Sequence, residues 1–250
     1  MKKVQTDLSI FKEFEFERKP VGVKFLLGKP EGINQLDKKL ALCEMFKEAQ
    51  EKGPFYAAQE NFECMVGPLI LGMKDPDPIF ESGQVGPKLG VYDDARANRR
   101  VYQQISTLSK DSVKYVAFAP FDALSFNPDI LIVVATIKQT EIILRAASYT
   151  SGKMWQSKGT GVIGCSWMYI HPYLSGELNL MITGLYHGMI ARQVFPEGLF
   201  LLSIPHDLLQ CVTTNLQQMV FDLPQYTQGK EAHIKRMKKI AEDLSQELRD

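Results

Sequence analysis

Residues 130–135 read Ile-Leu-Ile-Val-Val-Ala, and residues 136–139 read Thr-Ile-Lys-Gln. An unbroken apolar run of this length predicts a central strand that is buried on both faces. Thr136 and Gln139 form a capping box, which predicts a helix that begins at once and runs to about Tyr149. A buried strand followed directly by a helix is typical of an α/β fold.

Patterns on both sides of this stretch predict the rest of the sheet. The turn Asn127-Pro128-Asp129 separates it from another apolar strand upstream. Apolar residues recur at helical spacing over residues 37–52, 136–149 and 205–219. Strands are predicted over residues 21–27, 55–58, 115–121, 130–135, 161–165, 178–183 and 199–204. The sequence therefore predicts an α/β (mixed α+β) fold, a mixed sheet with flanking helices.

Two segments of the chain share one layout. Residues 21–72 and residues 130–176 each contain a strand, a helix that ends at a glycine, a second strand, a cysteine and a further glycine. If both are copies of one β-α-β half, a pseudo-twofold axis would bring Cys64 and Cys165 close together. Few residues are identical between the two segments, so coincidence is the alternative.

Composition excludes several classes of protein. Lys plus Arg and Asp plus Glu both number 29, so no basic excess attracts nucleic acid or anionic lipid. No apolar run approaches the roughly 18 residues of a membrane helix, and the N-terminal stretch MKKVQTDLSIFKEFEFERK carries acids where a signal peptide needs an apolar segment. Four scattered cysteines do not form a disulfide scaffold. We expect a cytoplasmic protein with no nucleic-acid or membrane partner. The chain also lacks the signatures of nucleoside triphosphatases, serine hydrolases and zinc proteases.

Two further segments have patterns of their own. Residues 75–87 (DPDPIFESGQVGP) are the longest loop-like stretch, and loops of this kind are often functional, so they are a candidate lid. Residues 229–250 carry Met237, Ala241, Leu244 and Leu248 at heptad-like spacing among many charges. This pattern predicts a long C-terminal amphipathic helix. It either docks on its own domain or serves as an arm that binds a partner or forms a homo-oligomer.

The candidate metal ligands are Cys43, Cys64 and Cys165. Thiolates bind zinc, copper and iron–sulfur clusters, and three of them leave one position open for a substrate. Their wide spacing is unlike the short Cys-x-x-Cys runs of strong metal motifs, so the alternative is that they are small buried apolar residues. Cys211 lies among apolar residues of a predicted helix and is expected to belong to the core.

Several short stretches together resemble the domain-of-unknown-function family 169. They are Pro20–Phe25, Cys43, Glu60–Cys64 with Gly67 and Leu71-Gly72, Asn127–Ile130, Arg145–Tyr149 and Cys165. The resemblance covers residues 14–219, the predicted core domain, and leaves residues 229–250 outside. It implies a cytoplasmic protein of archaea and anaerobic bacteria with recurrent cysteines at positions 43, 64 and 165. It also implies a further cysteine near residues 184–188, where this chain has Tyr186 and His187 instead.

His187 is therefore the candidate fourth ligand, since glycines surround it and a predicted strand precedes it. Arg145 and Arg192 are candidates for binding an anionic ligand or cofactor, because guanidinium groups pair with carboxylate and phosphate. Three functions stay open. The first is a metal- or iron–sulfur-binding protein of anaerobic metabolism with a small-molecule pocket, the second a non-catalytic module that binds a small anionic metabolite, and the third an assembly subunit that uses its C-terminal helix.

Overall fold

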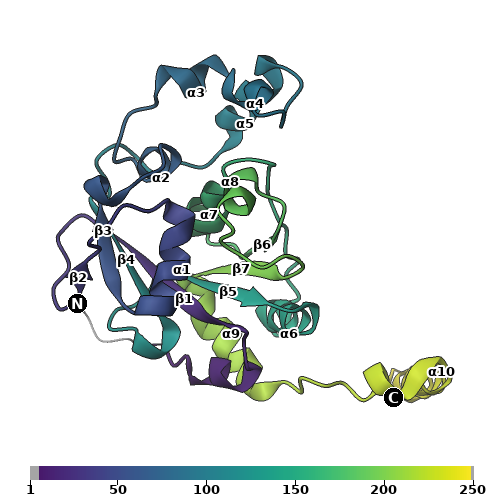
Figure 1. The fold of residues 1–250 in the computed structure, drawn as a ribbon. Coiled ribbons are helices and arrows are strands. Elements are labelled where there is room, and N and C mark those ends of the chain that lie inside the picture. Colours follow the sequence, from purple (N-terminus) through teal and green to yellow (C-terminus); the bar gives the residue numbers. More distant parts are fainter. Residues whose placement is uncertain (1–5, 249–250) are drawn as a thin grey trace. The chain divides into compact units, whose positions relative to one another are not determined.

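The computed structural model describes residues 6–248, which divide between Gln217 and Gln218 into two compact units. The first unit contains a seven-stranded sheet in the order β2-β3-β4-β1-β5-β7-β6 (Figure 1). The strands are β1 (Arg18–Leu26), β2 (Asn34–Gln35), β3 (Phe55–Ala58), β4 (Tyr115–Pro120), β5 (Ile130–Ala135), β6 (Asn179–Ile182) and β7 (Phe200–Pro205). Only the β2–β3 pair is parallel among the described strands. The prediction of a mixed sheet is confirmed.

β5 lies at the centre of the sheet, between β1 and β7, and all six of its residues are buried. Its side chains alternate between the two faces because successive residues of a strand point in opposite directions. Ile130, Ile132 and Val134 pack in one cluster with α1 (Leu42–Lys52) and η4 (Ser166–Ile170). The prediction of a central strand buried on both faces is confirmed.

The opposite face of the sheet is covered by α6 (Ile137–Ser148) and α9 (His206–Gln218). Their buried apolar side chains do not belong to the cluster around α1. The two helices contact each other, since the Asn215 Nδ2 donates a hydrogen bond of 2.8 Å to the Ala146 carbonyl. The predicted capping box is present: the Gln139 N–H donates to the Thr136 Oγ1, and the Thr136 N–H donates to the Gln139 Oε1.

The second of the two similar segments departs from the predicted layout. No strand forms over residues 161–165, where a turn leads into a helix that runs from Gly164 to Ser175 through η4 and α7 (His171–Ser175). That predicted strand is wrong, because Ile163 has a left-handed backbone (φ 56°) that no strand adopts. The strands nevertheless form two antiparallel triplets, β3-β4-β1 and β6-β7-β5, which meet at the β1–β5 pair.

Residues 75–87 are not the loop that their glycines and prolines suggest. They form α3 (Pro78–Ser82) and the start of α4 (Val85–Lys88), which pack with α5 (Ala95–Gln104) as the small helical group labelled at the top of Figure 1. The prediction of a loop was wrong because Asp77 accepts a hydrogen bond from the Ile79 N–H, and Pro78 then begins a helix. The remaining short helices are η1 (Ser9–Phe14), η2 (Gln59–Asn61), α2 (Val66–Ile70), η3 (Phe121–Ala123) and α8 (His187–Ala191).

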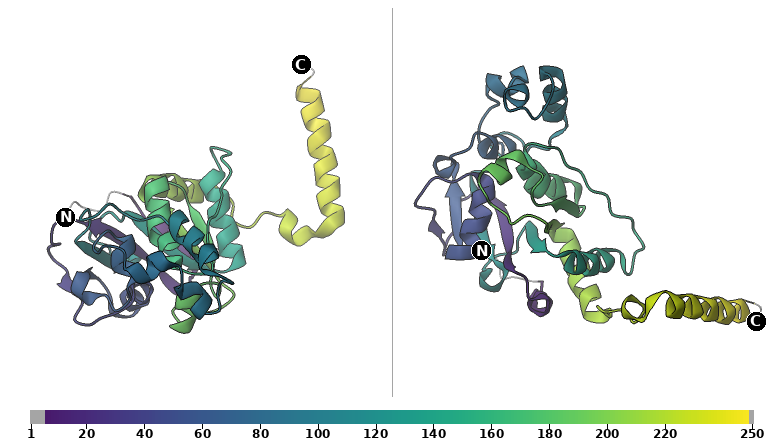
Figure 2. Two further views of the ribbon diagram at one scale, coloured as in Figure 1. Left: turned by 90° about the horizontal axis from the view of Figure 1, so that it is seen from above. Right: turned by 45° about the vertical axis from the view of Figure 1, so that its right-hand side comes forward.

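The second unit contains α10 (Gln225–Glu247), which forms over most of the predicted C-terminal helix of residues 229–250, and residues 249–250 lie outside the described residues. Gly229 adopts φ 77° and ψ 177°, which interrupts the helix and produces the bend that Figure 2 shows near its start. Among residues 6–248, no helix combines the length and apolarity that crossing a membrane requires.

Candidate functional site

Cys43 lies in the first turn of α1 and is almost fully buried, with 5% of its surface exposed. The Glu44 carboxylate accepts a hydrogen bond of 2.8 Å from the Ala41 N–H and so caps the start of the helix. Met45 and Phe46 are completely buried and hold α1 against the sheet. The position favours the thiolate form of Cys43, because the N-terminus of a helix carries partial positive charge.

Cys165 lies in the first turn of the helix that begins at Gly164. The next five residues, η4, form a π-helical segment, a conformation that often marks functional sites. Ile163, two residues before the thiol, has a positive φ that is strained for a β-branched residue. Asn179 holds the π-helical segment in place, because its Nδ2 donates hydrogen bonds to the carbonyls of Trp167 (2.9 Å) and Lys158 (3.0 Å).

Cys64 lies between η2 and α2 and is partly buried against the same apolar cluster. Its Sγ accepts a hydrogen bond of 3.4 Å from the Gly67 N–H and another from the backbone of Leu42. A Cβ at Gly67 would lie 2.6 Å from the Phe62 ring, so a larger residue would force that ring to move. Backbone N–H groups that point at a sulfur stabilise its thiolate form, as they do in iron–sulfur proteins.

The three thiols meet on the α1 side of the sheet. Cys43 and Cys165 are close enough for each thiol to shift the pKa of the other, Cys43 also acts on Cys64, and Cys64 acts on Cys165. The hydrogen bond from Cys165 lowers the pKa of Cys43, whereas the same bond together with burial raises the pKa of Cys165 well above its usual range. Burial raises the pKa of Cys64. The two thiols therefore titrate as a coupled pair in which the thiolate form is more favoured at Cys43 than at Cys165.

Arg192 supplies positive charge at this site. It acts on all three thiols and favours their thiolate forms. Its Nε lies 3.7 Å from the Glu44 carboxylate, so the cation is held at the start of α1. Tyr169 closes the site from η4: it is fully buried, and its hydroxyl donates a hydrogen bond of 3.2 Å to the Leu42 carbonyl. Glu44 and Tyr169 were missed from the sequence, although Glu44 adjoins Cys43.

Other elements of the fold carry His187, Arg145 and Cys211. His187 begins α8, is half-buried, and donates its backbone N–H to the Gly161 carbonyl at 3.1 Å. It is not among the groups that shift the pKa values of the three thiols. Arg145 lies on α6, at the opposite face of the sheet, and pairs with Glu141 at 2.9 Å. Arg145 and Arg192 therefore do not converge on one ligand. Cys211 is partly buried on α9, 3.4 Å from the Asn215 Nδ2.

The described residues contain no set of three or more His, Cys, Asp or Glu side chains in the arrangement of a preformed metal site. The three thiols supply the soft sulfur ligands that iron–sulfur clusters, zinc and copper(I) prefer, so their chemistry fits such a group.

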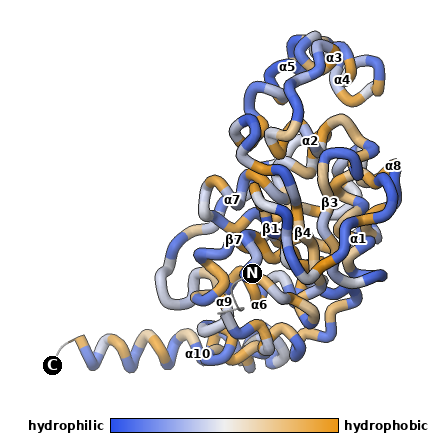
Figure 3. The backbone as a smooth tube through the Cα atoms, turned by 90° about the vertical axis from the view of Figure 1, so that its left-hand side faces the viewer, coloured by the Kyte–Doolittle hydropathy of each residue, from blue (hydrophilic) through white to orange (hydrophobic). Residues whose placement is uncertain are grey.

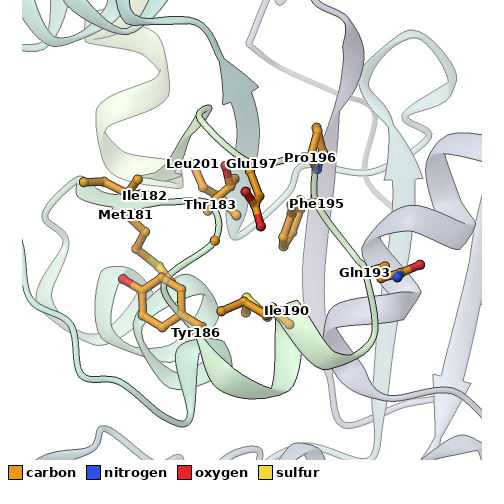
Figure 4. Close-up of a pocket in the computed structure, with 12 residues that line it drawn as sticks. Met181, Ile182, Thr183, Tyr186, Ile190, Gln193, Phe195, Pro196, Glu197 and Leu201 are labelled. Carbon is orange, nitrogen blue, oxygen red and sulfur yellow. The ribbon is translucent and has the colours of Figure 1, made fainter.

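A cavity of about 260 Å³ lies between β6, α8 and β7 (Figure 4). Its walls are mainly apolar: Met181, Tyr186, Met189, Ile190, Phe195 and Leu201. It shares a wall with the thiol site, because Tyr186 and Met189 pack directly on Gly164, which precedes Cys165. Figure 4 shows the Glu197 carboxylate directed into this cavity. Burial raises the pKa of Tyr186 to about 12, so its hydroxyl stays protonated.

The sequence of this chain matches the DUF169 family, described as uncharacterised ArCR, over residues 9–215. The chain belongs to this family. The predicted resemblance is thereby confirmed, with bounds that differ by a few residues from the predicted 14–219. The match contains the whole sheet and the three clustered cysteines, and α10 lies outside it. No curated protein and no solved structure shows significant similarity to the chain.

Proposed function

We propose that this DUF169 protein binds a thiophilic metal ion or an iron–sulfur cluster through Cys43, Cys64 and Cys165. The observation that carries the proposal is that three thiols, far apart in the sequence, meet at the starts of two helices and beside Arg192. Helix N-termini and a guanidinium group both favour thiolates, which are the metal-binding form of cysteine. An isolated group of buried apolar cysteines has no need of this positive charge.

The bound group would supply a Lewis-acidic or redox centre with one position free of protein ligands. Burial around Cys43 and Cys165 would exclude water from it. Arg192 would balance the negative charge of the thiolates and of an anionic ligand. The neighbouring cavity, which shares the wall at Gly164, would admit a small organic molecule. The protein would act in the cytoplasm, where thiols stay reduced.

Metal analysis of anaerobically prepared protein tests this proposal. We expect iron, zinc or copper in stoichiometric amount, and a brown colour with charge-transfer absorption if the group is an iron–sulfur cluster. Cys43→Ser, Cys64→Ser and Cys165→Ser should each lower the metal content. Cys211→Ser is the matched control, because Cys211 lies on the opposite face of the sheet. A colourless, metal-free protein that is fully folded and takes up neither metal nor cluster on reconstitution would overturn the proposal.

A non-catalytic role in binding a small anion is the second candidate. It is favoured by Arg192 alone, since Arg145 lies on the other face of the sheet and is paired with Glu141. An anion that binds only the folded protein would raise its melting temperature. Screening carboxylates and phosphates against the wild type and Arg192→Gln distinguishes this role. Stabilisation that is lost in Arg192→Gln but kept in Cys43→Ser would favour anion binding without a metal.

A further inference from the structure

α10 carries an apolar stripe whose side chains are largely exposed among the described residues of its unit. Ile234, Met237, Ala241, Leu244 and Leu248 follow one another in alternating steps of three and four residues, the spacing of a coiled-coil seam. Ile234 is 43% exposed, Met237 51% and Leu244 50%, whereas a docked helix would bury such residues. Figure 3 shows apolar and polar residues alternating along the helix. The stripe begins after Gly229, where the helix is interrupted.

The charges of α10 are divided between its two halves. Residues 230–239 carry the basic side chains Lys230, Lys235, Arg236, Lys238 and Lys239 and one acidic residue, Glu231. Residues 240–248 carry Glu242, Asp243 and Glu247 and no basic residue. A second copy in the parallel direction would place like charges against each other, which destabilises a pair. A second copy in the antiparallel direction would place each basic half against an acidic half.

We propose that α10 pairs with α10 of a second copy of this chain, in the antiparallel direction. In this pair Ile234 of one copy faces Leu244 of the other, and Met237 faces Ala241. Apolar side chains therefore contact one another at the centre of the pair. The surrounding charges attract at both ends. The stripe spans about 21 Å at about 1.5 Å per residue, which is short for a coiled coil, so the association is expected to be weak and to weaken with salt. This inference is independent of the metal site.

Sedimentation of the full chain over a concentration series tests the seam. The wild type is expected to show a monomer–dimer equilibrium that shifts toward monomer at high salt. The double variant Met237→Asp with Leu244→Asp should be monomeric at concentrations where the wild type is dimeric. The matched control is Ser245→Asp with Gln246→Asp, which adds the same charge at exposed positions outside the stripe and should leave the dimer intact. A wild type that stays monomeric throughout, or a seam variant that dimerises like the wild type, would refute the proposal.

Charge reversal tests the direction of pairing. One variant carries Lys235→Glu, Lys238→Glu and Lys239→Glu, and the other carries Glu242→Lys, Asp243→Lys and Glu247→Lys. In an antiparallel pair each variant alone sets like charges against each other, so each should dissociate at least about tenfold more readily, while an equal mixture should form a heterodimer. Circular dichroism confirms that α10 stays helical. If each variant dimerises alone as well as the wild type, the antiparallel pairing is wrong.

Discussion

The thiols of Cys43 and Cys165 interact with each other, although the two residues lie in the first turns of different helices and are far apart in the sequence. Such a pair holds its protons jointly, so the state of one thiol depends on the other. Within the pair, the interaction lowers the pKa of Cys43 and raises the pKa of Cys165. The nucleophilic or metal-binding character of the site is therefore set by a residue at the start of η4 and not by α1 alone.

Replacing Cys165 by Ala should raise the pKa of Cys43, because the hydrogen bond that favours its thiolate is removed. Alkylation of Cys43 by iodoacetamide should then become slower at neutral pH, since the thiolate is the reactive form. The pH–rate profile, followed by mass spectrometry of the Cys43 peptide, measures the change. Cys165→Ser keeps an O–H donor and should preserve most of the wild-type profile. Equal profiles for the wild type and the Ala variant would contradict this account.

The raised pKa of Cys165 also predicts a loss of stability in alkali. The unfolded thiol ionises near pH 8.5, while the folded one stays protonated to higher pH because of its bond to Cys43 and its burial. Above that pH the unfolded state binds fewer protons than the folded state, so the free energy of unfolding falls as pH rises. Urea unfolding between about pH 8 and 10 should show a smaller fall in Cys165→Ser, because serine does not ionise there. A slope as steep as that of the wild type would mean that other groups cause the effect.

Gly164 joins the thiol site to the cavity, and the space around it is full. A Cβ at this position would lie 2.8 Å from the Tyr186 ring and 3.0 Å from Met189. Gly164→Ala should therefore lower the free energy of unfolding by about 1–3 kcal/mol and shift Tyr186 toward the cavity. Gly28→Ala is the control, because nothing lies within 4 Å of a Cβ there. Thermal unfolding compares the two, and equal melting temperatures would show that the packing at Gly164 is loose.

Much of the fold follows from local patterns, as the stretch from Ile130 to Tyr149 shows. Its apolar run and capping box predict β5 and α6 without knowledge of the rest. Asp77 and Pro78 carry a helix-start signal that their glycine- and proline-rich surroundings concealed. The turn at Ile163 was missed because a β-branched residue rarely adopts a positive φ, and only tertiary packing imposes it.

The candidate site was only partly predictable for a related reason. The resemblance to the family was enough to select three cysteines, Cys43, Cys64 and Cys165. Their proximity in space depends on how the sheet positions α1, β3 and η4. The contact between Arg192 and Glu44 depends on the same placement. No spacing along the sequence encodes these contacts. No sequence pattern distinguishes Arg192 from Arg145 either, although the fold places Arg145 on the opposite face of the sheet.

Asn179 is expected to be essential for the π-helical segment that follows Cys165. It is completely buried and binds the Lys158 N–H, the Lys158 carbonyl and the Trp167 carbonyl. Asn179→Ala leaves these groups without partners and should cost about 3 kcal/mol of stability. Asn34→Ala, at an exposed position on the edge strand β2, should change it by less than about 0.5 kcal/mol. Near-ultraviolet circular dichroism of Trp167 should change only in the Asn179 variant, and an unaltered signal would show that η4 holds its shape without this residue.

The cavity beside the thiols predicts a preference for small organic cations. Glu197 is directed into it, and within residues 6–248 this carboxylate has no ion pair or hydrogen bond. Tyr186 and Phe195 add aromatic faces, which attract cations, and the exposed Ile182 and Ile190 form an apolar rim.

Hexylammonium should therefore raise the melting temperature more than hexanol or hexanoate does, since only the amine pairs with the carboxylate. Glu197→Gln should weaken amine binding about tenfold, while Glu231→Gln on α10 should leave it unchanged. Cys43→Ser should bind the amine as the wild type does, whether or not the thiols hold a metal. Equal stabilisation by the alcohol and the amine would show that the cavity prefers neutral apolar ligands instead.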